Sequence, residues 1–189
     1  MNLRVLGLPI MLIACQAAPE PPLAGARIGG PFTLVDQNGQ VRRDTDFAGK
    51  YRIMYFGYTY CPDVCPVDVR TIAQGYRAFA NANPAKAARV VPIFVSVDPE
   101  RDTPAVIKQF TAAFDPALVG LSGTPAQIAS VTKAYGVAYQ LNKQPGNANY
   151  LVDHSRTAYL MDPDNRPIAL LSHDAKPSVI ADELAKWVR

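Results

Sequence analysis

Residues that bind soft metal ions are scarce in this sequence, which has three cysteines and two histidines among its 189 residues. A closed zinc site built from four cysteines is therefore excluded, although four ligands are usual in structural zinc sites. Apolar residues make up 49% of the chain, so a globular domain of this length can form without disulfide bonds.

Long runs of one charge are also absent. The formal net charge is +3, and the basic residues are dispersed along the chain. Proteins that bind nucleic acid usually concentrate their basic residues in a patch. We therefore expect no nucleic-acid partner. Internal repeats are absent as well.

The N-terminal apolar run, residues 5–13, is too short to span a bilayer. Arg4 precedes it, and Leu12-Ile13-Ala14-Cys15 resembles the bacterial lipobox, whose cysteine is acylated. We predict a lipoprotein-type signal peptide over residues 1–14 and a lipid-anchored Cys15, which places the protein in the bacterial cell envelope, facing the periplasm. The alternatives are an ordinary cleaved signal and a short uncleaved anchor. Each places the domain outside the cytoplasm, where disulfides are permitted.

A proline-containing segment follows Cys15. Pro19, Pro21 and Pro22 in this segment are typical of an extended, flexible linker. We predict that residues 15–30 tether a single folded domain, residues 31–189, to the membrane.

Strand and helix patterns alternate through the first part of that domain. Residues 51–58 and 90–97 are nearly continuous apolar runs, typical of strands buried on both faces. Thr103-Pro104 and Thr124-Pro125 are start signals for helices. The remaining expected elements are a hairpin around Asn38-Gly39, a helix after residue 67, short strands at 119–121 and 137–141, a polar loop at 142–149, paired strands at 157–161 and 167–171, and a closing helix at 177–188.

This order predicts an α/β fold, a mixed sheet with helices on both faces. Two thiols, Cys61 and Cys65, lie between the first long strand and its helix. That position makes the predicted fold thioredoxin-like.

The spacing of the thiols favours a shared ion. Residues at i and i+4 of a helical turn lie on the same side, about 5–6 Å apart, and a helix N-terminus stabilises a thiolate. Thiolates select Cu(I), zinc or iron–sulfur clusters. The thioredoxin redox motif is one residue shorter, yet a redox dithiol stays an alternative. The other alternative to a shared ion is a structural disulfide or a pair of buried thiols.

The two histidines differ in context. His154 precedes an apolar strand and has Asp153 and Ser155 beside it, one of which we expect to orient its ring. His154 is a candidate third ligand, and the alternative is a loop histidine with no such role. We interpret His173 as an exposed turn residue. Asp63, between the thiols, either tunes the local charge and contacts a partner or caps the helix.

Three motifs in order resemble those of the Sco/SenC copper proteins. They are Gly57-Tyr58-Thr59-Tyr60-Cys61-Pro62-Asp63-Val64-Cys65-Pro66, Val95-Ser96-Val97-Asp98-Pro99-Glu100-Arg101-Asp102-Thr103-Pro104, and Val152-Asp153-His154-Ser155 with Tyr159-Leu160-Met161-Asp162-Pro163. The resemblance extends over about residues 30–189, nearly the whole predicted domain.

The resemblance implies one copper ion, Cu(I) or Cu(II), bound by Cys61, Cys65 and His154, with Asp63 and Asp153 as candidates in the surrounding shell. It implies a metallochaperone that assists assembly of the copper site of cytochrome c oxidase. The implied partners are the copper-bearing oxidase subunit or another copper chaperone. We expect residues 98–103 to shape the loop beside the site.

Two other functions stay open. A thiol–disulfide oxidoreductase would use Cys61 and Cys65 without metal and keep partner cysteines reduced. A peroxide-reducing or redox-sensing relative of the same fold would need a peroxide-reactive cysteine. An enzymatic activity is therefore neither required nor excluded by the sequence.

Overall fold

The computed structural model describes residues 19–146 and 149–189. Residues 1–14 and Cys15, predicted as signal peptide and lipidated residue, lie outside the described residues, as do residues 147–148 of the predicted polar loop. The strands are β1 Thr33–Asp36, β2 Val41–Arg43, β3 Tyr51–Gly57, β4 Val90–Ser96, β5 Val119–Ser122, β6 Tyr139–Leu141, β7 Val152–His154, β8 Ala158–Met161 and β9 Pro167–Leu170. The helices are α1 Val64–Ala82, α2 Pro84–Ala87, α3 Pro104–Ala112, α4 Pro125–Ala134 and α5 Pro177–Trp187, with a 3₁₀ turn at Asp44–Phe47.

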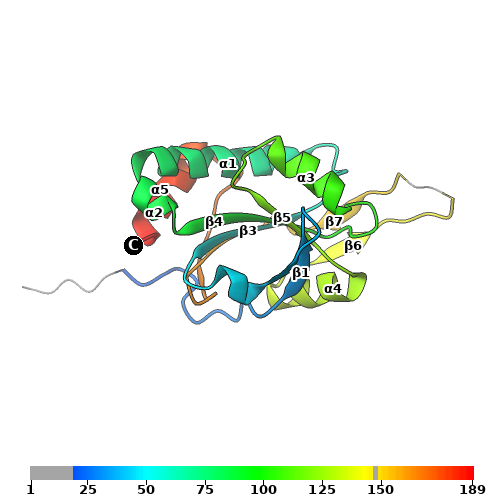
Figure 1. Cartoon of the computed structure of the whole chain (residues 1–189), viewed down its shortest axis with the longest axis horizontal. Helices are drawn as coiled ribbons and strands as arrows, with labels where there is room; N and C mark the ends of the chain where they lie inside the picture. Colours follow the sequence, from blue (N-terminus) through cyan, green and yellow to red (C-terminus); the bar gives the residue numbers. More distant parts are fainter. Residues whose placement is uncertain (1–18, 147–148) are drawn as a thin grey trace, which may run out of the picture.

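Within the described residues, seven strands form one mixed sheet in the order β2-β1-β5-β4-β3-β8-β9. β3, β4 and β5 run parallel to one another, whereas β1 and β8 flank them antiparallel. Helices α1 and α3 cover one face and α4 covers the other (Figure 1). The predicted mixed sheet with helices on both faces is confirmed.

The two predicted central strands form because their residues can be buried on both faces. All seven residues of β3 are buried. Ile53 and Tyr55 face a core shared with α1 and α5, while Met54 and Phe56 face a second core shared with α4. A central strand with two covered faces explains why the apolar run is continuous rather than alternating.

The predicted helix starts are also confirmed. Thr103 and Thr124 each accept a hydrogen bond from a backbone N–H in the first turn of α3 and α4, and a proline follows each cap. The Asn38-Gly39 turn joins β1 to β2, with Gly39 at a positive φ of 77°. Asn165 takes φ 64° in the turn between β8 and β9.

One strand before β8 was not predicted. His154 does not stand in a loop: it is the last residue of β7, which pairs antiparallel with β6 in a separate two-stranded sheet. The polar loop at 142–149 is thus the connection of this hairpin. β7 has only three residues, too few to produce a period-two pattern in the sequence.

The first described residues lie along the domain. Of the predicted tether, residues 19–30 are described. The N–H of Leu23 donates to the carbonyl of Ile168 in β9 (3.0 Å), and the N–H of Gly29 donates to that of Ala134 in α4 (2.9 Å). Among the described residues, none of the helices has both the length and the apolar character needed to cross a bilayer.

Candidate metal centre

The two thiols lie where β3 ends and α1 begins. Asp63 occupies the N-cap position of α1, so Cys61 precedes the helix and Cys65 lies in its first turn. The two thiols hydrogen-bond each other, and the N–H of Cys65 donates to Cys61 Sγ (3.4 Å). Both cysteines are free. The helical turn therefore presents two neighbouring sulfur atoms, as the i, i+4 spacing predicts.

His154 reaches the thiols through the register of the sheet. β8 pairs antiparallel with β3, with Ala158 opposite Tyr55. The residues just before β8 consequently lie at the end of β3 where the cysteines follow. The distance from His154 Nε2 to Cys65 Sγ is 3.2 Å. The structure thus brings together the three predicted ligands.

The imidazole is held by its neighbours. Tyr55 and Tyr58 contact the His154 ring edge-on, with centroid distances of 6.4 and 5.9 Å. The other ring nitrogen, Nδ1, lies 3.2 Å from the carbonyl oxygen of Ser155. The carboxylate of Asp153 instead accepts a hydrogen bond from Asn142 (2.9 Å). Of the two residues expected to orient the ring, Ser155 makes the contact, through its backbone.

The two thiols have opposite electrostatic environments. Burial alone would raise the pKa of Cys61, but the N–H groups of Cys65, Asp63 and Val64 point at its sulfur and lower the pKa below its usual range. Burial raises the pKa of Cys65, which is fully buried, to about 12, although a hydrogen bond from the Tyr58 backbone partly offsets it. Cys61 is therefore the reactive thiol and Cys65 the protected one.

Burial likewise lowers the pKa of His154, so its imidazole is neutral near pH 7. A neutral imidazole has a free lone pair for a metal ion. Asp63 is exposed, and its side chain makes no capping hydrogen bond. Its capping role is therefore absent, and a role in tuning charge or contacting a partner stays a prediction.

Space for the buried sulfur depends on Gly57. A Cβ at this position would lie 3.2 Å from Cys65 Sγ and 2.9 Å from a ring carbon of Tyr55. Glycine at the end of β3 therefore lets the thiol lie against the strand.

A buried carboxylate lies behind the thiols, and the sequence analysis missed it. Asp68 is fully buried in α1 and accepts hydrogen bonds from Tyr55 Oη (2.9 Å) and from Arg156 (Nη2 at 2.5 Å). His173 Nε2 lies 3.5 Å from the same carboxylate, with its side chain only 11% exposed. His173 lies in a turn, as expected, but the interpretation of its side chain as exposed was wrong. A polar residue on the buried face of α1 was the signal in the sequence, because buried carboxylates require partners.

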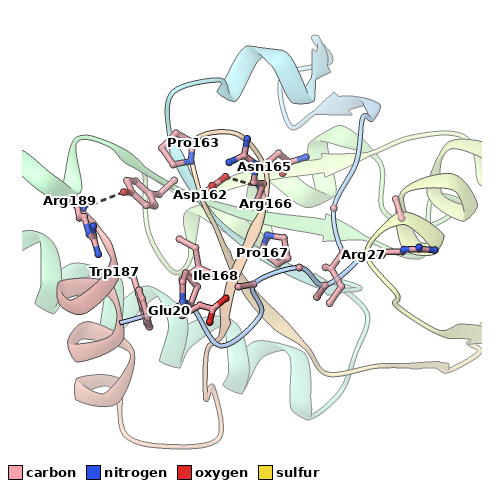
Figure 2. Close-up of a pocket in the computed structure, with 18 of the residues that line it drawn as sticks. Glu20, Arg27, Asp162, Pro163, Asn165, Arg166, Pro167, Ile168, Trp187 and Arg189 are labelled. Atoms are coloured by element: carbon pink, nitrogen blue, oxygen red, sulfur yellow. Dashed lines mark hydrogen bonds between the residues drawn. The ribbon is translucent and has the colours of Figure 1, made fainter. Parts of the chain in front are cut away.

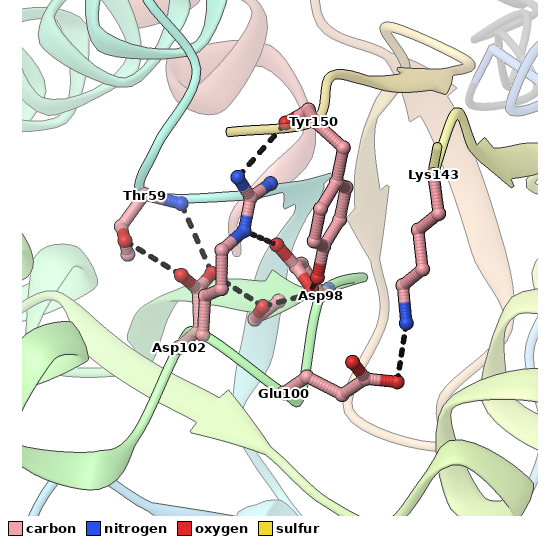
Figure 3. Close-up of polar contacts among 8 residues, drawn as sticks. Thr59, Asp98, Glu100, Asp102, Lys143 and Tyr150 are labelled. Carbon is pink, nitrogen blue, oxygen red and sulfur yellow. Dashed lines mark hydrogen bonds and ion pairs between the residues drawn. The ribbon is translucent and has the colours of Figure 1, made fainter. Parts of the chain in front are cut away.

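A second polar network fixes the loop before Cys61 (Figure 3). The buried carboxylate of Asp102 accepts hydrogen bonds from the Thr59 N–H (3.0 Å), the Thr59 hydroxyl (2.6 Å) and the Ser96 hydroxyl (2.5 Å). Asp98 accepts from Tyr150 Oη (2.6 Å) and Arg101 Nε (2.5 Å). The expectation that residues 98–103 shape the loop beside the site is confirmed.

Arg101 connects this network to the hairpin that carries His154. Its Nη1 donates to the Tyr150 carbonyl (2.8 Å), and its guanidinium lies 3.6 Å from the Tyr150 ring centroid and 5.0 Å from that of Tyr60. Tyr60 precedes Cys61, and Tyr150 precedes β7. One side chain thus contacts both segments that supply ligands.

The donor set suits a copper ion. Thiolates are soft ligands and imidazole also suits copper, so two thiolates with one imidazole satisfy three-coordinate Cu(I). Among the described residues, no group of three or more His, Cys, Asp or Glu side chains is placed so that it could hold a metal ion as it stands. Cys65 contacts both Cys61 and His154, and the three donors lie at a partly exposed edge, which is the arrangement expected for an ion that is handed on.

Comparison with known proteins agrees with this geometry. A family model, SCO1/SenC, matches residues 20–189. Protein SenC of Rhodobacter capsulatus is 44% identical over 161 residues, covering 85% of this chain and 71% of that protein.

Solved structures with copper bound are also similar. ScoI of Bradyrhizobium japonicum is 42% identical, with a TM-score of 0.76 over 85% of this chain and 99% of that one. ScoI of Arabidopsis thaliana is 35% identical, with a TM-score of 0.77 over 84% and 97%. The expected thioredoxin-like fold is thereby confirmed.

Proposed function

The chain belongs to the SCO1/SenC family, and we propose that it is a copper chaperone that binds one ion through Cys61, Cys65 and His154. The observation that carries the proposal is the contact between His154 Nε2 and Cys65 Sγ at 3.2 Å, with Cys61 beside them. Copper bound in the structures of similar Sco proteins supports the assignment. Its recipient is the copper-bearing subunit of cytochrome c oxidase or another copper chaperone.

The test is an anaerobic copper titration of the reduced protein. We expect one Cu(I) per chain, and loss of that stoichiometric binding in Cys61→Ser and Cys65→Ser. His154→Ala loses Cu(II) binding because Cu(II) needs the nitrogen donor. His173→Ala removes the other histidine and is the matched control, which we expect to bind one ion. Full Cu(II) binding by His154→Ala would remove His154 from the site.

A thiol–disulfide oxidoreductase is the second candidate, favoured by the asymmetry of the two thiols. A low-pKa, partly exposed thiol followed by a buried one is the arrangement of a dithiol that attacks a disulfide and then resolves it. Turnover of a disulfide substrate that survives His154→Ala but not Cys61→Ser would establish it. Reduced protein that has this activity and binds no copper would exclude the chaperone.

We also propose attachment to the cell envelope through the N-terminus. Residues 1–14 would be a signal peptide and Cys15 the acylated residue, with the folded domain in the periplasm. The sequence Leu12-Ile13-Ala14-Cys15 supports this. Mass spectrometry of the N-terminal peptide from membranes tests it: a free Cys15 thiol or an intact residue 1–14 segment contradicts acylation.

A further inference from the structure

A cleft of about 1210 Å³ lies at the end of the sheet opposite the thiols (Figure 2). Tyr51, the first residue of β3, lines it, whereas the thiols follow Gly57, the last residue. A seven-residue strand is about 20 Å long. Residues from the first described segment, 19–29, form one wall, and the turn between β8 and β9 forms another.

The rim of this cleft carries an excess of basic side chains. Four basic residues and two acidic ones line it: Arg27, Lys133, Arg166, Arg189, Glu20 and Asp162. Across residues 19–146 and 149–189, neither Arg27 nor Lys133 forms an ion pair. Arg166 pairs with Asp164 at 3.5 Å, but both side chains are exposed, so the pair is weak.

The acidic residues of the turn are largely engaged. Asp162 Oδ1 accepts hydrogen bonds from the backbone N–H groups of Asp164 and Arg166. Behind the turn lies Arg52, only 2% exposed, which interacts electrostatically with Asp44 and, less strongly, with Asp162 and Asp164 of the turn. Its Nε and Nη1 have no hydrogen-bond partner among the described residues. This buried positive charge offsets the two carboxylates and leaves the rim net cationic.

The floor of the cleft is apolar. Trp187 and Ile168 line it together with several prolines. Trp187 is only 5% exposed and its N–H donates to Glu183 (2.7 Å), so its ring gives the cleft a fixed apolar floor beneath the basic rim.

The proposed lipid anchor lies close to this cleft in sequence. Cys15 is the proposed acylated residue, and Pro19 already lines the cleft. Four residues span at most about 14 Å. A bilayer that holds an acylated Cys15 therefore lies within about 14 Å of Pro19 in the wall of the cleft.

We propose that this cleft and its basic rim are a docking surface for the headgroups of anionic phospholipids. Arginine and lysine side chains bind the phosphate groups, and the domain then lies on the membrane with its thiol end directed away from the lipid. Each basic residue held at an anionic bilayer strengthens binding about fivefold. The inference rests on the proposed N-terminal attachment, to which it adds a second contact.

The test uses the full chain and vesicles of phosphatidylcholine, with and without phosphatidylglycerol. Trp187 is the sole tryptophan, so its fluorescence reports on the cleft alone. Lipids with a nitroxide on the headgroup quench it when the cleft faces the bilayer. We expect stronger quenching in anionic than in neutral vesicles, decreasing with added salt.

The variant Arg27→Gln with Lys133→Gln removes two unpaired cations, so we expect docking to weaken about 25-fold. Arg70→Gln with Lys108→Gln makes the same charge change at exposed positions on α1 and α3 and is the matched control. Equal quenching in neutral and anionic vesicles would overturn the proposal, as would wild-type docking by the first variant.

Two further experimental outcomes would also overturn the docking proposal. Failure of the full chain to float with anionic vesicles would overturn both docking and attachment. A larger loss of Trp187 quenching in inorganic phosphate than in sodium chloride of equal ionic strength would assign the cleft to a soluble anion and overturn the lipid proposal. The copper titration is independent of each result, so a failure here is distinguishable from failure of the copper function.

Discussion

Replacing Asp102 by alanine tests how the loop before Cys61 is held. The carboxylate accepts three hydrogen bonds, two from Thr59 and one from Ser96. Asp102 and Ser96 are almost fully buried, and Thr59 is half-buried. Alanine leaves these donors without their acceptor, next to the segment that leads into the first thiol.

The expected loss of stability in Asp102→Ala follows from the three hydrogen bonds that these donors no longer make. A buried donor left unpaired costs about 1–3 kcal/mol. Water can reach Thr59 and the hydroxyls can rotate, so we expect Asp102→Ala to lower the free energy of unfolding by about 2–4 kcal/mol. Small domains have about 5–15 kcal/mol of stability, so the variant still folds. Its copper then dissociates faster, since the position of Cys61 is less restricted.

Asparagine at the same position separates geometry from charge. Its amide oxygen can take the place of Oδ2 and accept from the Thr59 N–H and the Ser96 hydroxyl, while its NH₂ donates to the Thr59 hydroxyl. We therefore expect Asp102→Asn to be within about 1 kcal/mol of the wild type near pH 7.

The pH dependence distinguishes the wild type from this variant. Burial raises the pKa of Asp102 above the ordinary value, although hydrogen bonds from Ser96 and Thr59 oppose the shift. As the pH falls through the folded-state pKa, the folded protein binds a proton before the unfolded chain does. The wild type therefore gains stability relative to Asp102→Asn, and the gain is complete below the unfolded pKa.

Urea unfolding of the three proteins from pH 7 down to pH 4 measures both effects, with copper dissociation followed by transfer to a chelator. An alanine variant within about 0.5 kcal/mol of the wild type would refute the network's role, because surface substitutions already fall in that range. A constant difference between wild type and Asp102→Asn across the pH range would refute the raised pKa.

Three other predictions concern the thiols. Iodoacetamide modifies Cys61 before Cys65 in the reduced apoprotein, because the pKa of Cys61 is lowered and burial raises that of Cys65 to about 12. Peptide mass spectrometry reports the order of labelling, and equal labelling of the two cysteines would contradict the prediction. In Gly57→Ala the added methyl group would crowd Cys65 Sγ, so we expect the free energy of unfolding to fall by about 1–3 kcal/mol. We also expect weaker Cu(I) binding in a chelator competition, and an unchanged Cu(I) affinity would contradict this prediction. Cu(I) binding at pH 7 releases the proton of the Cys65 thiol, so the heat of binding measured by calorimetry depends on the ionisation enthalpy of the buffer. A heat that does not depend on the buffer would mean that Cys65 was already a thiolate or does not bind the ion.

Much of the site could be predicted because its signals are local. Cys61 and Cys65 are four residues apart on one helical turn, so their proximity follows from helix geometry. The buried strand before them is visible as an apolar run, since a strand covered on both faces has no polar side.

Other features depend on contacts between distant segments. The position of His154 requires β8 to pair with β3 at one register, and a shift of one residue would turn its neighbours to the opposite face. The partners of Asp68 and Asp102 could not be identified from the sequence, because they are between 6 and 105 residues away. The cleft at the other end of the sheet gathers residues from 19 to 189.

The sequence by itself indicated the candidate donor atoms, the order of the main strands and helices, and the family resemblance, because each rests on local pattern. Only the tertiary structure decided which histidine meets the thiols and which thiol is acidic. Those properties arise from burial and from amide groups aimed at sulfur, and both exist only when the sheet, α1 and the hairpin are assembled.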